Sequence, residues 1–455
     1  MSIQTINPAT GEVIKTYEEM PDNEVETIID HTHSVYEEWR HTSFAERAEK
    51  MRKLAQLLKD NKEEYGKIMT LEMGKPITAA MAEIEKCAWV CEYYAQTAEE
   101  HLQDRVIKTE KTKSKVCYRP RGIVFAIMPW NFPFWQVFRF LCPTLMAGNA
   151  GLLSHAPIST GTGLAIEELT VKAGFPQGLF KSLIVNNDGS AKVIGNEKVT
   201  AVTITGSEGA GKAVATEAGQ HLKKVVLELG GSDPYVILDD ADLDQAAEAC
   251  VTSRLLNTGQ VCIAAKRLIV VEKVLKDFEK LVIEKSKRYQ MGDPLDPNTN
   301  FGPMAREDLR AKLQEQVDRS IQEGAELVTG GQIPDGKGFF YPVTILKNVK
   351  DTMVPFKEEL FGPVIAIIPA LDEIEALKMA NDTPYGLAGA VFTQDTERGE
   401  KIATDLIEAG SVAVNCFVGS DPRLPFGGIK LSGFGRELSE EGIREFVNVK
   451  TVSVE

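Results

Sequence analysis

Cys262 lies in a stretch of the sequence where a thiol could act as a nucleophile. Gly259 ends a predicted helix and a predicted strand begins near Leu268, so Cys262 is expected on the loop between them. Functional residues concentrate on such loops, and a partly ionised thiol is a strong nucleophile. Most intracellular cysteines are buried structural residues, so position alone separates Cys262 only slightly from the other six.

Glu228 is a carboxylate at the end of an apolar run. Residues 225–227 (Val-Val-Leu) predict a buried strand, and a carboxylate there is costly unless it has a partner or a task. The carboxyl ends of parallel strands are also where such sheets bind ligands. Glu228 is therefore either a functional group or part of a buried ion pair or cap, and the sequence leaves both interpretations open.

Gly206 and Ser207 begin a turn that joins an apolar run to a helical stretch. The free N–H groups and the dipole of a helix N-terminus favour a phosphate, and Ser207 could cap the helix or bind an anion. The glycines stand at 206, 209 and 211, which is not the Gly-x-Gly-x-x-Gly spacing. An ordinary strand-to-helix turn explains the pattern as well as a phosphate site does.

Asn131 lies in a rigid turn, residues 129–133 (Pro-Trp-Asn-Phe-Pro), directly after the apolar run 123–128. The turn places one amide donor at the carboxyl end of a predicted strand. The alternative is a structural turn in which the asparagine side chain bonds its own backbone.

Composition excludes several classes of function. The 455 residues are enough for two or three domains, and a net charge of −15 would repel nucleic acid and anionic membranes. No apolar run is long enough to span a bilayer and the first residues lack a signal-peptide pattern, so a cytoplasmic protein is expected. Seven cysteines do not suggest a disulfide framework, and six scattered histidines give no metal-ligand spacing, so no metal is expected.

The chain divides into a helical start and two blocks of alternating strands and helices. Helices are expected at 22–39, 44–61 and 77–102, followed by a charged connector, 108–115, that is a solvated loop or an exposed strand. From Gly122 the expected strands are 123–128, 152–153, 183–185, 201–205 and 225–229. The helices between them are 135–146, 160–173, 191–195 and 209–220.

The second block begins near Tyr235. Its expected strands are 235–238, 268–271, 364–367, 388–392 and 412–415, and its helices are 243–256, 274–287, 306–323, 373–380 and 397–408. Alternation of this kind predicts an α/β fold with two parallel sheets covered by helices. Residues 446–454 form a strand-like run without a nearby partner, so we expect it to pair elsewhere, with another subunit as one option.

Several stretches together make the sequence similar to the aldehyde dehydrogenase superfamily along essentially its whole length. They are 7–12 (Asn-Pro-Ala-Thr-Gly-Glu), 129–133, 205–207 (Thr-Gly-Ser), 228–231 (Glu-Leu-Gly-Gly), 259–262 (Gly-Gln-Val-Cys), 359–363 (Glu-Leu-Phe-Gly-Pro) and 425–428 (Pro-Phe-Gly-Gly). Each alone is weak evidence, but their order makes a chance match improbable. Residues 420–428 (Ser-Asp-Pro-Arg-Leu-Pro-Phe-Gly-Gly) resemble the succinate-semialdehyde dehydrogenase type.

The resemblance implies a catalytic role for three residues. Cys262 would attack the aldehyde to give a thiohemiacetal, while the Asn131 amide and the Cys262 N–H stabilise the oxyanion. Glu228 would act as general base for the water that hydrolyses the thioester. Glu437 matches a second carboxylate sometimes assigned to proton relay, and a surface ion pair is an equally good interpretation of it.

The resemblance also implies NAD or NADP as cofactor. The residues matching the cofactor site are Trp130, Ser154, Gly206, Ser207, Glu359 and Phe361, with Glu359 on the nicotinamide ribose. Ser154 stands where many members carry a lysine, and Pro157 where many NAD-specific members carry a glutamate. We therefore expect weak discrimination between the two cofactors, with a lean to NAD. Lys181 from another segment is the alternative cation.

A small semialdehyde carrying a carboxylate is the expected substrate. Trp135 and Arg139 are i,i+4 neighbours on a predicted helix, and Arg139 could bind the carboxylate while Ser420 adds a hydrogen bond. A structural salt bridge is the alternative for Arg139. Two other functions stay open: an acyl-CoA-forming dehydrogenase, which tends to lack the base matched by Glu228, and a non-catalytic binding or structural protein.

We expect three structural units. Residues 1–107 and 122–229 would form the Rossmann-like cofactor-binding domain and 230–424 the catalytic domain. Residues 108–121 and 438–455 would form an oligomerisation element, in a homodimer or homotetramer.

Overall fold

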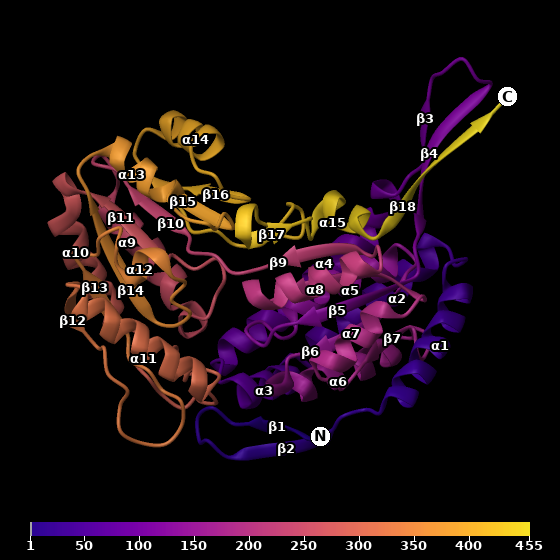
Figure 1. The fold of residues 1–455 in the computed structure, drawn as a ribbon, viewed down its shortest axis with the longest axis horizontal. Coiled ribbons are helices and arrows are strands. Elements are labelled where there is room, and N and C mark those ends of the chain that lie inside the picture. The colour runs from indigo at the N-terminus through magenta and orange to yellow at the C-terminus, as the bar shows by residue number, and fades with distance from the viewer. Residues whose placement is uncertain (1) are drawn as a thin grey trace.

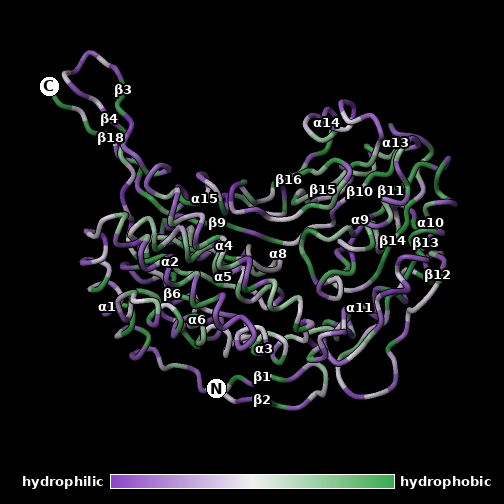
Figure 2. Tube along the Cα trace, turned by 180° about the vertical axis from the view of Figure 1, so that it is seen from behind, coloured by the Kyte–Doolittle hydropathy of each residue, from purple (hydrophilic) through white to green (hydrophobic). Residues whose placement is uncertain are grey.

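Two parallel sheets, one from each half of the chain, form the centres of two lobes in the computed structural model, which describes residues 2–455 (Figure 1). Figure 2 shows that hydrophobic residues follow the central strands, whereas the outer helices and loops are more hydrophilic. The α/β class with two sheets is therefore confirmed.

The first lobe is built on a six-stranded sheet in the order β17-β9-β8-β5-β6-β7. Its parallel strands are β5 (Ile123–Met128), β6 (Ala150–His155), β7 (Phe180–Ser182), β8 (Val199–Thr205) and β9 (Lys224–Glu228), and β17 (Gly433–Phe434) is antiparallel. The helices are α1 (Asp22–Trp39), α2 (Phe44–Asp60), α3 (Lys62–Met73), α4 (Ile77–His101), α5 (Trp135–Met146), α6 (Thr160–Lys172), α7 (Asn187–Gly195) and α8 (Glu208–Gln220). A short 3-10 turn, η1 (Pro157–Ser159), precedes α6.

The second lobe contains a seven-stranded sheet in the order β12-β13-β14-β11-β10-β15-β16. Its strands are β10 (Pro234–Ile237), β11 (Arg267–Val271), β12 (Glu326–Thr329), β13 (Thr344–Lys347), β14 (Val364–Ala370), β15 (Ala388–Phe392) and β16 (Ser411–Val414); only β12 is antiparallel. Its helices are α9 (Leu243–Leu255), α10 (Glu272–Ser286), α11 (Glu307–Gln322), α12 (Val354–Lys357), α13 (Glu373–Asn381) and α14 (Thr396–Asp405).

The C-terminal segment returns from the second lobe to the first, which also carries the N-terminal hairpin. After η3 (Lys430–Ser432) and β17, α15 (Ser439–Glu445) leads into β18 (Val447–Val454). That strand joins β4 (Lys113–Pro120) and β3 (Arg105–Ile107) in a sheet that projects from the lobe, with the C-terminus near its tip (Figure 1). The N-terminal hairpin of β1 (Ser2–Ile6) and β2 (Val13–Glu18) lies on the other side of the same lobe.

One predicted strand is wrong, several elements were not predicted, and the C-terminal run pairs elsewhere as expected, within one chain. The strand expected at 183–185 lies earlier, as β7, and Leu183 follows it with one backbone bond to Leu153. Helix α3 and strands β1, β2, β12 and β13 were not predicted. The run 446–454 has its partner in the same chain, because Val447–Val454 pairs antiparallel with Pro120–Lys113 along the whole of β4.

The parallel strands of the first lobe bring three turns to one edge of the sheet. The register aligns Thr205 with Glu228 and Met128 with His155, so these strand ends are neighbours. The turns that carry Asn131, Pro157 and Gly206 therefore leave the sheet on the side where α/β sheets bind ligands.

Candidate active site

The Cys262 loop follows an unusual backbone path between α9 and β11. After α9, the turn η2 (Leu256–Gly259) places Asn257 and Thr258 in the left-handed region, with φ of 51° and 56°. Gly259 follows with φ of 74°, and a Cβ there would lie 2.3 Å from the Gly362 backbone oxygen. Glycine is thus required by both conformation and space. The predicted position of Cys262 on a helix-to-strand loop is confirmed.

Arg254 joins this loop to the segment that contains Glu359. Its side chain is fully buried, and it donates to the backbone oxygens of Val364 at 2.6 Å, Gly259 at 3.0 Å and Leu360 at 2.7 Å. One guanidinium thus satisfies carbonyls from two loops that are distant in sequence. The contact fixes the two motifs relative to each other.

Lys266 connects the Cys262 loop to two more predicted segments. Its buried ammonium donates to Gly231 O at 2.6 Å and to Cys262 O at 2.5 Å, and it pairs with Glu359 Oε1 at 2.6 Å. The Gly231 N–H donates to the same Glu359 oxygen at 3.2 Å. The segments around Glu228, Cys262 and Glu359 therefore meet at one cation.

Asn131 is held against the Cys262 loop. Its Nδ2 donates to Gln260 O at 3.0 Å, and Asn257 Nδ2 donates to Asn131 O at 2.8 Å. The alternative in which Asn131 bonds its own backbone is wrong. Asn131 Nδ2 carries a second hydrogen, and the Cys262 N–H has no acceptor within residues 2–455, so both groups have a donor to spare.

Glu228 is buried at the end of β9 without a hydrogen bond to either carboxylate oxygen. It forms no ion pair and caps no helix in the described part of the chain, so neither of the structural interpretations applies to it. Burial, and then the nearby carboxylate of Glu437, hold the pKa of Glu228 well above its usual range. Arg139 and Arg436 act in the opposite direction.

Arg139 and Glu437 form an ion pair beside Glu228. Arg139 Nη2 lies 2.6 Å from Glu437 Oε2, both side chains are buried, and the guanidinium lies over the Phe426 ring at 4.6 Å. Arg139 therefore makes the salt bridge given as its alternative role. The surface ion pair suggested for Glu437 is wrong, because Glu437 and its partner Arg139 are both buried.

The Cys262 thiol is protonated at neutral pH in this state. Burial raises its pKa to about 11, and the positive charges of Lys266 and Arg139 oppose that rise. The thiol must lose its proton to a nearby acceptor before it can attack a carbonyl.

The residues predicted for the cofactor lie around the same sheet edge. Ser207 caps α8, because its Oγ accepts the Ala210 N–H at 3.3 Å. Trp130 and Phe361, far apart in sequence, meet edge to face with 5.9 Å between ring centres. Ser154 is buried in β6 and makes no side-chain hydrogen bond within residues 2–455.

The residues predicted for the substrate come together with a lysine that was not predicted. Trp135 Nε1 donates to Ser420 Oγ at 3.0 Å, which confirms that these two residues are neighbours. Lys86 Nζ donates to the same hydroxyl at 2.9 Å.

Sequence reasoning missed Arg254, Lys266 and Lys86. For Arg254 and Lys266 a signal existed, because a cation in or beside an apolar element must find partners when it is buried. Lys86 gave no such signal, since a lysine on an amphipathic helix is ordinarily solvent-facing.

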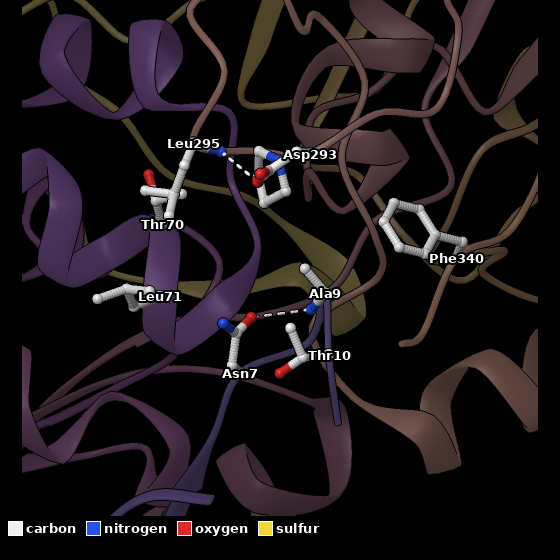
Figure 3. Close-up of a pocket in the computed structure, with 9 residues that line it drawn as sticks. Asn7, Ala9, Thr10, Thr70, Leu71, Asp293, Leu295 and Phe340 are labelled. Atoms are coloured by element: carbon white, nitrogen blue, oxygen red, sulfur yellow. Dashed lines mark hydrogen bonds between the residues drawn. The ribbon is translucent and has the colours of Figure 1, made fainter. Parts of the chain in front are cut away.

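A cavity of about 360 Å³ lies elsewhere, between the N-terminal turn, α3 and the loop after α10 (Figure 3). Asn7, Thr10, Thr70, Asp293 and Phe340 are among its lining residues, and none of the predicted site residues is. Within residues 2–455 no cluster of histidine, cysteine and acidic side chains could hold a metal ion. None of the helices in that part of the chain is both long and apolar enough to cross a membrane.

Comparisons with known proteins agree with this geometry. A family model described as "Aldehyde dehydrogenase family" matches residues 1–452. A probable succinate-semialdehyde dehydrogenase [NADP(+)] of Synechocystis is 45% identical over 452 residues, which cover 99% of each chain. A succinate semialdehyde dehydrogenase [NAD(P)+] of Escherichia coli is 44% identical, covering 98% of this chain and 97% of the relative. The crystal structure of succinic semialdehyde dehydrogenase from Streptococcus pyogenes with NADP+ has a TM-score of 0.97 and 38% identity, covering 99% of both chains.

Proposed function

The chain belongs to the aldehyde dehydrogenase family, and we propose that it oxidises succinate semialdehyde, or a similar small semialdehyde with a carboxylate, to the acid with reduction of NAD or NADP. The observation that carries this proposal is the arrangement around Cys262. Asn131 is bonded to its loop, and the segment that follows the buried, unpartnered Glu228 carboxyl meets the same loop at Lys266.

The first half-reaction follows from these three groups. The Cys262 thiol releases its proton to solvent water, and its sulfur bonds to the aldehyde carbon to form the thiohemiacetal anion. The Asn131 amide and the Cys262 N–H donate to the oxygen that becomes negative. A nicotinamide held against Trp130 and Phe361 would supply the hydride acceptor for that carbon, and Cys262 would then carry a thioester.

Hydrolysis is the task of Glu228. Its carboxylate form takes a proton from water, the hydroxide oxygen bonds to the thioester carbon, and the carbon–sulfur bond breaks to release the acid. A buried carboxyl with a raised pKa suits this exchange, because its carboxylate form is a stronger base than an ordinary glutamate.

The residues present fit a dinucleotide. The N–H groups of Glu208 and Gly209 at the start of α8 have no acceptor within residues 2–455, and a Cβ on Gly209 would meet no atom within 4 Å. Gly206 and Ser207 would lie beside the pyrophosphate, Trp130 and Phe361 against the nicotinamide, and Glu359 at its ribose. Ser154 would face the adenosine ribose.

Cofactor preference is the one expectation that the comparisons do not support. The relatives are named for NADP(+) or NAD(P)+, which gives no reason to lean to NAD. Pro157 offers no carboxylate to repel a 2′-phosphate, and Ser154 offers no cation to attract it. The protein uses both cofactors with little discrimination.

The assembly follows from the projecting sheet. Its edge strands expose Val106, Ile107 and Val449, three apolar side chains that a neighbouring subunit would cover. We propose that residues 108–121 and 438–455, joined by β3 from the end of the first predicted segment, form the oligomerisation element of a homodimer or homotetramer. The rest of residues 1–107, with 122–229, would bind the cofactor, and 230–424 would form the catalytic domain.

One assay tests the function. The purified protein is given succinate semialdehyde or neutral aldehydes with NAD or NADP, with and without coenzyme A, and cofactor reduction is followed. We expect reduction without coenzyme A, fastest with succinate semialdehyde. A requirement for coenzyme A would favour an acyl-CoA-forming enzyme, and no reduction would favour a non-catalytic protein.

Two controls tie the activity to the thiol. Cys262→Ala should abolish reduction while the protein remains folded, whereas Cys142→Ala and Cys250→Ala should change it little. Both control cysteines are buried, whereas Cys262 is partly exposed, so the comparison separates loss of the nucleophile from loss of a core thiol.

A further inference from the structure

Lys86 lies beside Trp135 and Ser420, two of the three residues that were predicted to contact the substrate. It projects from the middle of α4, which packs against α5 (Figure 1), and its Nζ donates to Ser420 Oγ at 2.9 Å. The same ammonium lies 4.4 Å from the centre of the Trp135 ring. Lys86, Trp135 and Ser420 form one hydrogen-bonded group, the Lys86 cluster, with members from α4, α5 and the loop after β16.

The Lys86 cluster holds donors that the chain does not use. Ser420 Oγ accepts hydrogen bonds from both Lys86 and Trp135, so its lone pairs are occupied and its O–H is left to donate. The Lys86 ammonium carries three N–H groups, and a single acceptor is found for them within residues 2–455. Converging donors of this kind suit an acceptor with several lone pairs, such as a carboxylate.

The positive charge of Lys86 has no ion-pair partner in residues 2–455. Asp421, the acidic residue next to Ser420, is bound to Arg423 through contacts of 2.9 and 2.6 Å. Glu83, on the same helix, is paired with Lys75 instead. The acidic side chains closest to Lys86 are thus already engaged.

Arg139 adds a second cation near Lys86. Partial burial, and then the charge of Arg139, lower the pKa of Lys86 to about 8. Glu437 offsets the charge of Arg139 alone. Of these two neighbouring cations only Arg139 has an ion-pair partner. The site therefore keeps a net positive charge, which an anionic ligand would neutralise.

We propose that Lys86, with the Ser420 hydroxyl, binds the carboxylate of the substrate and sets the preference for carboxylated aldehydes. The inference rests on the proposed function, since it needs a substrate with an acid group. Trp135 begins α5 four residues after Asn131, which is bonded to the Cys262 loop. The short segment from Asn131 to Trp135 therefore contacts the Cys262 loop at one end and belongs to the Lys86 cluster at the other.

Four proteins test the proposal: wild type, Lys86→Met, Lys86→Arg and Lys62→Met. Lys62 is the matched control, because it is an exposed lysine whose partner, Glu85, precedes Lys86 on α4. KM and kcat are measured for succinate semialdehyde and for pentanal, which has a similar length and no charge. We expect Lys86→Met to raise the KM for the semialdehyde at least about tenfold and to leave pentanal nearly unchanged. Lys86→Arg should recover most of the loss, and Lys62→Met should match wild type.

The outcomes separate the two proposals. If wild type does not prefer the semialdehyde over pentanal, the proposed function itself is wrong. If wild type shows the preference and Lys86→Met keeps it, the role of Lys86 is overturned.

A second measurement covers the case in which Lys86→Met does not fold. Calorimetry of wild type with succinate, the product, gives Kd as a function of pH. The charged and titratable groups around Lys86 are Glu83, Cys87, Arg139 and Asp421. Because Lys86 loses its proton near pH 8, Kd should rise between about pH 7 and pH 9.5. A Kd that stays constant over that range would overturn the proposal.

Discussion

Arg139 and Glu437 form a buried ion pair, with 2.6 Å between Arg139 Nη2 and Glu437 Oε2. The pair lies beside Glu228, whose carboxyl has no hydrogen-bond partner in residues 2–455. One guanidinium therefore compensates two buried carboxyl groups. Removing it would leave Glu437 without its ion-pair partner and Glu228 with the charge of Arg436 alone.

Arg139→Met should lower thermal stability and also slow turnover with charged and neutral aldehydes alike. Removal of one partner from a buried ion pair costs about 3–5 kcal/mol, whereas an exposed pair contributes about 0–1 kcal/mol. Arg288→Met is the control, because Arg288 forms an exposed pair with Glu248. Melting curves and steady-state kinetics give both quantities. A variant with unchanged melting and a higher KM for the semialdehyde alone would instead make Arg139 a substrate ligand.

Much of the fold could be predicted from local pattern, and particular residues show where that stops. Strand β5 is uniformly apolar and α5 is bounded by a rigid turn, so both were predicted at their observed limits. The predicted strand at 183–185 was wrong, because three apolar residues after a short strand do not reveal which of them joins the ladder. The partner of β18 is β4, which overlaps the charged connector that the sequence predicts as a solvated loop or an exposed strand. Its charges gave no sign of this pairing.

The residues of the site also divide into those that a local sequence motif could reveal and those that it could not. Cys262, Glu228 and Asn131 stand in motifs that are contiguous in sequence, so a resemblance could find them. Lys266 and Arg254 act through backbone carbonyls contributed by distant loops. No sequence pattern encodes such a contact, because any residue supplies the carbonyl.

Gly259→Ala should displace the Cys262 loop and lower turnover by at least about tenfold. The left-handed backbone costs a residue with a Cβ roughly 1–2 kcal/mol, and a misplacement of about 1 Å in an active site can cost far more in rate. The Cβ would also lie 2.3 Å from Gly362 O, a backbone atom that cannot simply rotate away. Gly219→Ala is the control, since a Cβ there meets nothing within 4 Å. Full activity in Gly259→Ala would contradict this account of the loop.

Turnover should increase from neutral to alkaline pH while the folded state loses stability. The base form of Glu228 appears only as pH rises through its raised pKa, so deacylation should accelerate as pH rises above neutral. Because the folded state holds protons on Glu228 and Glu437 that the unfolded state has lost, their contribution to stability is present at low pH and disappears as pH rises.

The pH prediction is checked by single-turnover kinetics and by melting temperatures across the same range. Glu228→Gln should show a burst of reduced cofactor followed by slow, pH-insensitive turnover. Loss of the burst itself would assign Glu228 to activation of Cys262. A wild-type deacylation rate that does not change with pH would contradict the buried, protonated state of Glu228.

Ser154→Lys should tighten the binding of both cofactors and favour NADP more. Ser154 lies at the end of β6, beside the turn that begins at Pro157, and its short side chain makes no hydrogen bond within residues 2–455. Lys181, the alternative cation, is paired with Glu167 at 2.5 Å, so its charge is already offset. A lysine at 154 could donate a charged hydrogen bond, which contributes roughly 1.5–3 kcal/mol, or about one to two powers of ten in affinity. A 2′-phosphate gains more from that charge than a ribose hydroxyl does.

Ser154→Met controls for side-chain length without charge, and KM is measured for both cofactors. Unchanged values in Ser154→Lys would mean that position 154 does not face the adenosine ribose.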